Sequence, residues 1–229
     1  MTGVPRTSSV STGRSVDRLV NFTDAVVAVA VTLLALPLVD IPGPGRGGTV
    51  WTVMGDHASE ISTFLFTFYV VAVMWAAHNR ILNGIRGYDG FLFWVNTTWL
   101  AAIVLLPWFS AMFGESAEGR ATVGLVYWGA LALISILSSL MGWHLQRSPG
   151  LCTDAHAAAP PPDRRAALRG PVFAGYFLAI GVVSLFWPEV ASWMPFGIIP
   201  LSIWFRPARP GEPEPVGPQS VEPHTRETP

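Results

Sequence analysis

The stretch RLVNFTDAVVAVAVTLLAL, residues 18–36, decides the fold of this 229-residue chain. At 1.5 Å of rise per residue, a helix of this length crosses most of the hydrocarbon core of a bilayer, which is about 30 Å thick. The stretch is almost entirely apolar, yet it contains the ionisable residue Asp24. Because a charge inside hydrocarbon is costly, Asp24 marks either a functional site or a contact between helices. The sequence therefore predicts a membrane-spanning helix with one polar position.

The composition of the whole chain supports a membrane protein. Apolar residues make up 51% of the chain and charged residues only 13%, whereas soluble domains are about 25% charged. The net charge is -1 and every positive residue is an arginine, which argues against a nucleic-acid partner. The single cysteine, Cys152, excludes an intramolecular disulfide and a cysteine-based metal cluster. We therefore expect an integral membrane protein whose partner is the lipid bilayer.

Apolar runs separated by polar or Pro/Gly-rich breaks divide the chain into helices. We expect an all-α integral membrane protein with six transmembrane helices. The expected spans are 18–40, 58–81, 91–113, 121–144, 170–187 and 189–206. Only Pro188 and Glu189 separate the last two spans, so five spans is the alternative.

The segments outside the spans give the domain boundaries and the topology. We expect a transmembrane domain at 15–206, a disordered N-terminal tail at 1–14 and a disordered Pro/Glu-rich tail at 207–229. Twelve of the fourteen arginines fall on one side of a six-span arrangement, leaving Arg46 and Arg120 on the other. Under the positive-inside rule, both termini are then cytoplasmic, and the protein is expected to be a multi-pass protein of the cell membrane.

Motifs typical of enzymes are weak in this chain. Gly43, Gly45 and Gly48 fit G-x-G-x-x-G, but they lie in a loop between two predicted spans rather than between a strand and a helix. The five histidines lack a second ligand at a helical metal-binding spacing. We therefore expect no enzyme, no catalytic residues, no metal, no cofactor and no soluble small-molecule substrate.

Several polar residues fall at one depth of the predicted bundle. Asp24 lies in the inner half of the first span, His78 ends the second, and Asn96 lies a few residues into the third. We expect a buried network of Arg18, Asp24, His78 and Asn96, capped by the indole N–H of Trp75, to satisfy groups that lipid cannot. Either this network has a functional role or it only locks the helices together.

A second pattern runs along the first helix. A face of small or apolar residues with one hydroxyl repeats at spacings of four and three: Arg18, Phe22, Ala25, Val29, Thr32 and Leu36. Taken alone, this face also fits ordinary helix packing, with the Thr32 hydroxyl bonded to a carbonyl of its own helix.

At these residues the sequence resembles a known family. Arg18, Phe22, Thr23 and Asp24 resemble the R-x-x-x-F-S-D signature of the endosomal/lysosomal potassium channel family, the transmembrane protein 175 family, in its prokaryotic single-repeat branch. The string W-A-A-H ending at His78, then Asn96 and L-L-P-W-F, follow in the family's order. Trp75 opens the first of these strings. Thr23 stands where the family has serine.

The resemblance implies a specific architecture and function. Six helices per subunit would assemble as a homotetramer, with the first helix lining a central pore that conducts K⁺ without a T-V-G-Y-G filter. Val29 matches the family's hydrophobic gate, where Ile or Leu is usual, and Thr32 matches a hydroxyl layer linked to cation selectivity. Ala25 and Leu36 would line the same pore, while Phe22 and Thr23 would belong to the structural polar network.

Two hypotheses follow for function. The first is a potassium channel, a K⁺-permeable homotetramer in which Val29 and Thr32 replace a carbonyl filter. The second is a non-conducting membrane scaffold, or a proton or solute transporter that uses the polar layer of Asp24 and His78.

Overall fold

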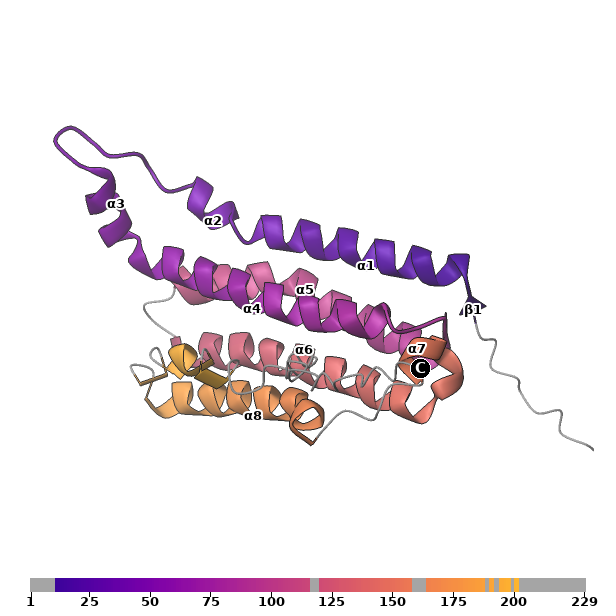
Figure 1. Cartoon of the computed structure of the whole chain (residues 1–229). Coiled ribbons are helices and arrows are strands. Elements are labelled where there is room, and N and C mark those ends of the chain that lie inside the picture. The colour runs from indigo at the N-terminus through magenta and orange to yellow at the C-terminus, as the bar shows by residue number, and fades with distance from the viewer. Residues whose placement is uncertain are drawn as a thin grey trace, which may run out of the picture.

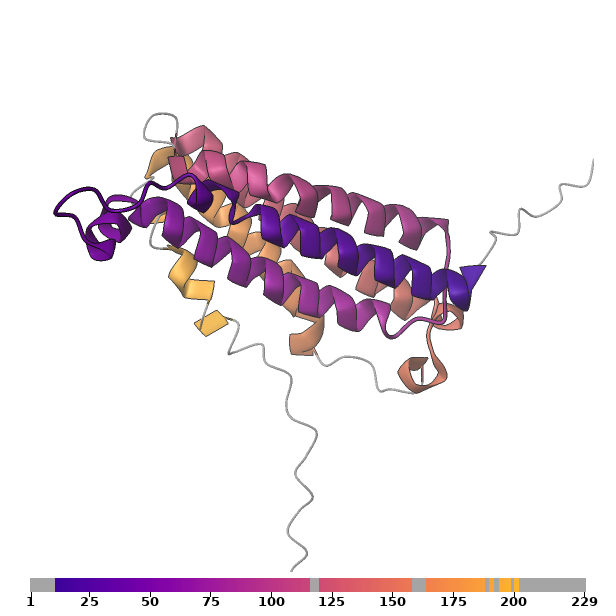
Figure 2. The ribbon, with the colours of Figure 1, turned by 90° about the horizontal axis from the view of Figure 1, so that it is seen from above.

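The computed structural model describes residues 11–115, 120–157, 164–187, 190–191, 194–198 and 200–201. Within them, the long helices lie roughly side by side in one elongated bundle (Figure 1). These helices are α1 (Arg14–Leu33), α4 (Ala58–Leu82), α5 (Gly90–Glu115), α6 (Arg120–Arg147) and α8 (Arg164–Phe186). α6 packs mainly on α8 and α5, whereas α1 contacts only α4 and α5 among the long helices. Figure 2 shows α1 lying along the groove between α4 and α5.

The first predicted span is broken near its outer end. Instead of running from 18 to 40, it begins at Arg14 and ends at Leu33, and a short helix, α2 (Leu36–Val39), follows. Pro37 accounts for the break, because proline has no N–H to donate and its ring clashes with the carbonyl four residues earlier. A loop then leads to α3 (Val50–Asp56), whose first turn is capped by the side chain of Thr49.

The predicted spans agree closely with the long helices. Five helices in the described part of the chain are long and apolar enough to cross a membrane: Arg14–Val39 (which joins α1 and α2), Ala58–Leu82, Gly90–Phe113, Ala121–Arg147 and Leu168–Phe186. α8 begins at Arg164, six residues before the predicted start at 170. Half of the sixth predicted span, 189–206, lies outside the described residues, which include there a short 3-10 helix, η2 (Met194–Gly197).

The predicted N-terminal tail is partly ordered. Its residues 1–10 and the whole tail 207–229 lie outside the described residues, but β1 (Ser11–Thr12) pairs antiparallel with β2 (Gly87–Tyr88). Gly13 follows with a φ of 63°, a left-handed conformation that glycine adopts without strain, and this turns the strand into α1. Residues 11–14 of the expected tail thus form a strand, a turn and the start of α1, and the boundaries of the tails stay predictions.

The connector between α6 and α8 is partly structured. It contains a 3-10 turn, η1 (Pro149–Leu151), and a short helix, α7 (Asp154–Ala157), while residues 158–163 lie outside the described part. Leu151 and Cys152 are buried, and the backbone of Cys152 forms an isolated antiparallel β-bridge with the backbone of Ile85. The connector therefore packs onto the loop between α4 and α5.

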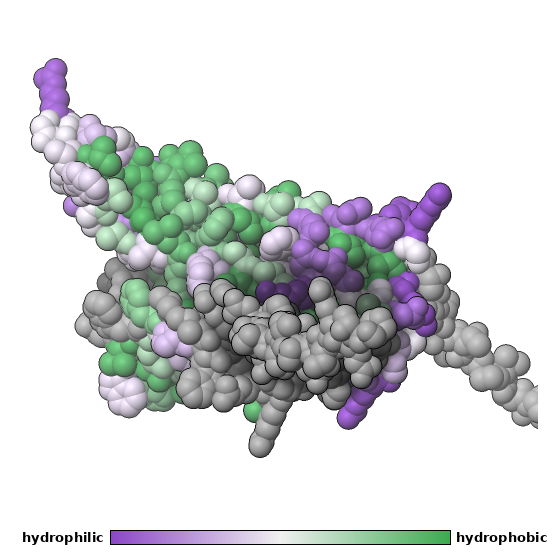
Figure 3. Space-filling view, viewed as in Figure 1, coloured by the Kyte–Doolittle hydropathy of each residue, from purple (hydrophilic) through white to green (hydrophobic). Residues whose placement is uncertain are grey.

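The core lies between α5, α6 and α8, and the outer surface is strongly apolar. Trp99, Tyr127, Trp128 and Phe177 are almost fully buried there. Apolar residues dominate the outward side of α1 and α4, and hydrophilic ones gather toward the β1 end and at the tip of the loop after α2 (Figure 3). A continuous exposed apolar surface of this kind suits lipid or another membrane helix.

Candidate pore helix and its polar anchor

α1 has one buried face and one open face. The buried face repeats at helical spacing and packs against α4 and α5: Val16, Leu19, Thr23, Val27, Ala30 and Leu34. Because these side chains sit three or four residues apart, they share one side of the helix. In the described part of the chain, the side chains on the other side of α1 are exposed.

The predicted stripe lies on that open side. All six of its residues are exposed: Arg18, Phe22, Ala25, Val29, Thr32 and Leu36. The exposed fraction is 59% for Phe22, 60% for Val29 and 58% for Leu36. Helix packing inside the subunit therefore does not account for the stripe. A partner outside the subunit, lipid or water must face it.

Thr32 shows how a hydroxyl on this stripe is oriented. Its Oγ1 donates a hydrogen bond of 2.7 Å to the carbonyl oxygen of Val29, as the packing interpretation expected. A hydroxyl has one proton and two acceptor lone pairs, so the bond uses the donor and leaves the acceptors available. Thr32 therefore presents an oxygen acceptor to whatever faces α1.

The buried side of α1 is held by a polar cluster. Asn96 on α5 donates from Nδ2 to the Thr23 hydroxyl at 3.1 Å, and its Oδ1 lies 2.8 Å from Nε2 of His78 on α4. Thr23 and Asn96 are fully buried, and His78 is 1% exposed. Because an amide oxygen only accepts, Nε2 of His78 carries the proton. Three helices are thus joined by two hydrogen bonds in an apolar setting.

The cluster extends to α6 through residues that sequence analysis did not select. The ring of His78 stacks on Trp99 at a centroid distance of 3.9 Å, and Trp99 donates from Nε1 to the Ser138 hydroxyl at 2.9 Å. Trp99 lies three residues after Asn96, on the same face of α5, and that spacing could have indicated it. The Nδ1 atom of His78 has no hydrogen-bond partner within the described part of the chain.

Asp24 forms a separate pair with Trp75. Nε1 of Trp75 donates to Oδ1 of Asp24 at 2.9 Å, and both side chains are half-buried. Trp75 therefore caps Asp24 as predicted. The indole bond satisfies one carboxylate oxygen close to the boundary between α1 and α4.

Arg18 and Phe22 lie outside the predicted network. Both are exposed, and among the described residues no hydrogen bond or ion pair joins Arg18 to Asp24, His78 or Asn96. Helix geometry gives the reason, because Arg18 is five residues before Thr23 and so lies about 140° around the helix from it. The structure thus divides the predicted set into a buried anchor and an exposed stripe.

A second polar cluster joins the helices nearer the other end of the bundle. Oγ1 of Thr67 lies 2.7 Å from the hydroxyl of Tyr127 and 3.2 Å from that of Ser110, linking α4, α6 and α5. All three residues are buried. Sequence analysis missed this cluster, since isolated hydroxyls in apolar spans usually bond to their own helix.

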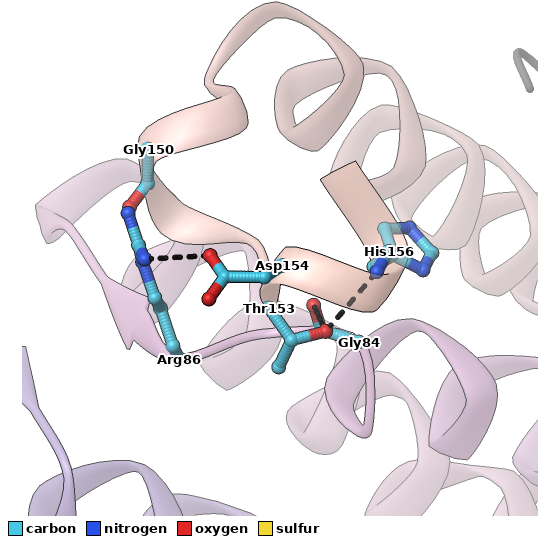
Figure 4. A network of polar contacts seen from close by, with 6 residues as sticks. All are labelled: Gly84, Arg86, Gly150, Thr153, Asp154 and His156. Carbon is cyan, nitrogen blue, oxygen red and sulfur yellow. Dashed lines mark hydrogen bonds and ion pairs between the residues drawn. The ribbon is translucent and has the colours of Figure 1, made fainter. Parts of the chain in front are cut away.

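The loops at the β1 end are tied together by polar contacts (Figure 4). Arg86 donates to Oδ1 of Asp154 at 3.1 Å and to the carbonyl of Gly150, and the N–H of Thr153 donates to the carbonyl of Gly84. Figure 4 shows α7 lying against the loop after α4, with His156 close to Gly84. These bonds attach the α6–α8 connector to the loop that also pairs with β1.

Asp89 caps α5 at the same end. Its Oδ1 accepts from the N–H of Leu92, and its Oδ2 lies 2.9 Å from Nε2 of His144 on α6. Partial burial alone would raise the pKa of the Asp89 carboxyl, but the bonds from Leu92 and His144 outweigh it and lower the pKa. The charged form is favoured at a helix N-terminus, where the helix dipole also stabilises a negative charge.

The geometry can now be compared with known proteins. A family model described as endosomal/lysosomal potassium channel TMEM175 matches residues 18–107, which contain every candidate site residue. The predicted resemblance to the TMEM175 family is confirmed.

Among the described residues, no group of three histidine, cysteine, aspartate or glutamate side chains is placed to hold a metal ion.

Relatives with TMEM175-like sequences are named as channels. A potassium channel of Streptomyces collinus is 29% identical over 146 residues, covering 62% of this chain and 70% of the relative. The endosomal/lysosomal proton channel TMEM175 of Rattus norvegicus is 25% identical over 195 residues, covering 78% of this chain and 39% of the rat protein. The chain thus spans well under half of the rat protein's length.

A solved TMEM175 homologue shares the fold. The crystal structure of a lysosomal potassium-selective channel TMEM175 homologue from Chamaesiphon minutus superposes with a TM-score of 0.66. The superposition covers 85% of this chain and 100% of that one, at 21% identity. The likeness therefore extends beyond the residues of the family model to α6 and α8.

Proposed function

We propose that this chain is a potassium-permeable cation channel, in which α1 lines the pore of a homotetramer in the cell membrane. The observation that carries the proposal is the open stripe of α1, which is exposed along its whole length while the opposite face is buried. Such a stripe needs a partner outside the subunit, and four copies around an axis would supply one. The relatives' names support ion conduction as the activity. K⁺ is the permeant ion, and the proposal includes no cofactor and no catalytic residue.

The polar anchor fixes which side of α1 faces the axis. Asn96 holds Thr23, and Trp75 holds Asp24, so α1 cannot rotate about its own axis without breaking buried hydrogen bonds. An orphaned buried polar group costs roughly 1–3 kcal/mol. The anchor thus has a structural role in the proposed channel, since it keeps the stripe turned away from α4 and α5.

Val29 forms the constriction in this proposal. Its side chain is 60% exposed in the subunit, so four copies would meet around the axis without distorting the bundle. A ring of apolar side chains expels water from a narrow segment and blocks ions until it widens. Valine is smaller than the Ile or Leu implied by the family resemblance, so the ring here is wider.

Thr32 forms the hydroxyl layer, about one turn outward from Val29. Its proton is bonded to the Val29 carbonyl at 2.7 Å, so its lone pairs are oriented to accept. Four such oxygens would replace part of the hydration shell of a cation and repel anions. Ala25 and Leu36 lie further along the same open side and line the inner and outer parts of the pore.

The membrane topology in this proposal places both termini in the cytoplasm. Twelve of fourteen arginines then face inward, and the end of the bundle that holds β1, β2 and α7 is the cytoplasmic end. An even number of spans requires a sixth helix within 189–206, after the five described candidates.

A proton pathway is the competing proposal, and two observations favour it. The rat relative is named a proton channel, and Nδ1 of His78 is buried without a partner in the described chain. In that case the layer containing Asp24 and His78, rather than the open stripe, would carry the ion. The structure weighs against a shared site, because Asp24 bonds to Trp75 and His78 bonds to Asn96.

Currents through three variants in planar bilayers separate these proposals. Val29→Asn should rewet the constriction and raise the basal K⁺ conductance. If this face of α1 instead packs against another helix, the variant would bury an amide there and would only destabilise the protein. Thr32→Ala should lower the K⁺-to-Na⁺ permeability ratio under bi-ionic conditions without abolishing current. Val31→Ala is the control and should leave the ratio unchanged, because Val31 lies about 160° around the helix from Val29 and packs against the core of the subunit.

The same recordings contain the outcomes that would overturn the channel proposal. Unchanged conductance in Val29→Asn, with a shifted reversal potential in Val31→Ala, would place a different stripe on the axis. A current that follows the pH gradient and ignores K⁺ would favour the proton pathway. Absence of any current from a correctly folded oligomer would favour a non-conducting scaffold.

A further inference from the structure

A groove opens between α4, α6 and α8, on the side of the bundle away from α1. Its volume is about 650 Å³, and large apolar side chains line it: Met74, Ile81, Ile136, Leu140, Trp143 and Phe173. The hydroxyls of Ser135, Ser138 and Ser139 also face it, but each donates to a carbonyl of its own helix four residues earlier. The groove wall is therefore mostly apolar, and its serine hydroxyls have no free proton to donate.

Close packing of α6 on α8 leaves this space beside α4. A Cβ added at Gly170 of α8 would meet the Ser139 hydroxyl of α6 at 2.0 Å, so the two helices touch there. α4 contacts α6 much less extensively than α8 does. Gly142 lies in the groove wall, and a Cβ added there would meet no atom within 4 Å. The groove is therefore open at that position.

Arginines gather at one end of the groove. Arg169 lines it and is half-buried. Arg147 lies over the ring of Trp143, which also lines the groove, 4.0 Å from its centroid. Within the described chain, no carboxylate forms an ion pair with Arg147 or Arg169. Two arginines at one end of an apolar groove, without an acid to pair with, favour an anion there.

We propose that the groove binds one anionic phospholipid, with an acyl chain along the apolar wall and the phosphate at the end of the groove marked by Arg147 and Arg169. From Gln146 to Ser135 the groove follows eleven residues of α6, about 16 Å, which suits an extended hydrocarbon chain. A small soluble anion would fill only the charged end and leave the apolar wall empty. Basic pockets between membrane helices at one membrane surface are known to favour anionic headgroups. The proposal goes beyond ion conduction and does not depend on it.

Quenching of tryptophan fluorescence tests the proposal on the full chain in phosphatidylcholine vesicles. Phosphatidylglycerol with a brominated acyl chain should quench more strongly than brominated phosphatidylcholine at the same mole fraction. Trp143→Phe should abolish that difference, because Trp143 is the tryptophan in the groove. Arg169→Gln should lower the preference for phosphatidylglycerol about fivefold, the effect of one arginine near a charged membrane surface.

Two controls match the charge and groove variants. Arg86→Gln removes an arginine that already pairs with Asp154 and should leave the preference unchanged. Gly142→Leu fills the groove without a clash and should remove the preference with every arginine intact, whereas Gly129→Leu adds the same side chain to α6 outside the groove. The Gly129 variant should behave as the parent.

Three outcomes would overturn the proposal. Equal quenching by the two brominated lipids would mean that the groove does not select an anionic headgroup. Competition by millimolar inorganic phosphate would make the site a phosphate site rather than a lipid site. A change in oligomeric state in Gly142→Leu, but not in Gly129→Leu, would make the groove an interface with a second copy of the chain. None of these readouts measures conductance, so they stand apart from the test of the channel.

Discussion

Asn96 is the residue on which the attachment of α1 depends. It bonds to Thr23 on one side and to His78 on the other, and all three are buried. Asn96→Leu keeps the volume but leaves a histidine N–H and a threonine hydroxyl without their partner. We expect the free energy of unfolding to fall by roughly 1–3 kcal/mol for each group left without a partner. The measurement is the midpoint of thermal unfolding in detergent, which should be lower than in the parent protein.

Thr98→Val is the control for this prediction. Thr98 lies two residues further along α5, is exposed, and bonds only to the carbonyl of Trp94 in its own helix. Its replacement should leave the midpoint nearly unchanged. Equal midpoints for Asn96→Leu and the parent protein would mean that the cluster does not hold α1.

The sequence could predict part of this cluster and not the rest. Asp24, His78 and Asn96 are conspicuous because polar groups inside apolar spans need partners, and Trp75 does bond to Asp24. Trp99 and Ser138 are not conspicuous, since a tryptophan and a serine are common in any membrane helix. The distribution of Arg18 and Thr23 over different faces follows from helix geometry, but nothing in the sequence says which face is buried.

At the scale of elements, glycines determine how closely α6 and α8 pack. A Cβ added at Gly181 would lie 3.3 Å from the Cβ of the buried Trp128. Gly181→Leu should push α8 away from α6 and lower the free energy of unfolding by about 1–3 kcal/mol, as overpacking does in protein cores. The measurement is again the midpoint of thermal unfolding in detergent.

Gly175→Leu provides the comparison within the same helix. Gly175 is exposed, and a Cβ added there would meet no atom within 4 Å. Both variants carry the same gain in helix propensity, so the difference between them isolates the contact with α6. A larger loss in Gly175→Leu than in Gly181→Leu would contradict the packing of α8 described above.

The spans were predictable because long apolar runs fix helix type and approximate length. α4, α5 and α6 agree with their predicted bounds within a few residues, and α8 within six at its start. The pairing of β1 with β2 was not predictable, since two residues carry no periodic pattern. The break after Leu33 has a cause in Pro37, but apolar residues on both sides concealed it.

At the scale of the whole molecule, the arginine distribution predicts orientation in the membrane. Gly45 lies in the loop after α2, and Gly150 lies in the connector at the opposite end of the bundle (Figure 1). In a Cys152→Ser background, an impermeant thiol reagent should label Gly45→Cys on intact cells and Gly150→Cys only after permeabilisation. Labelling of Gly150→Cys on intact cells would reverse the proposed topology.

The two halves of α1 are held to the bundle by different kinds of contact. Ser11 and Thr12 pair with the loop after α4, and Thr23 and Asp24 form hydrogen bonds with α5 and α4. Beyond Asp24, the buried side chains Val27, Ala30 and Leu34 are all apolar, and the helix breaks after Leu33. Thr32 lies about 12 Å along the helix from Asp24. A bend of α1 beyond Asp24 would therefore displace Thr32 while the hydrogen bonds of the anchor stay intact.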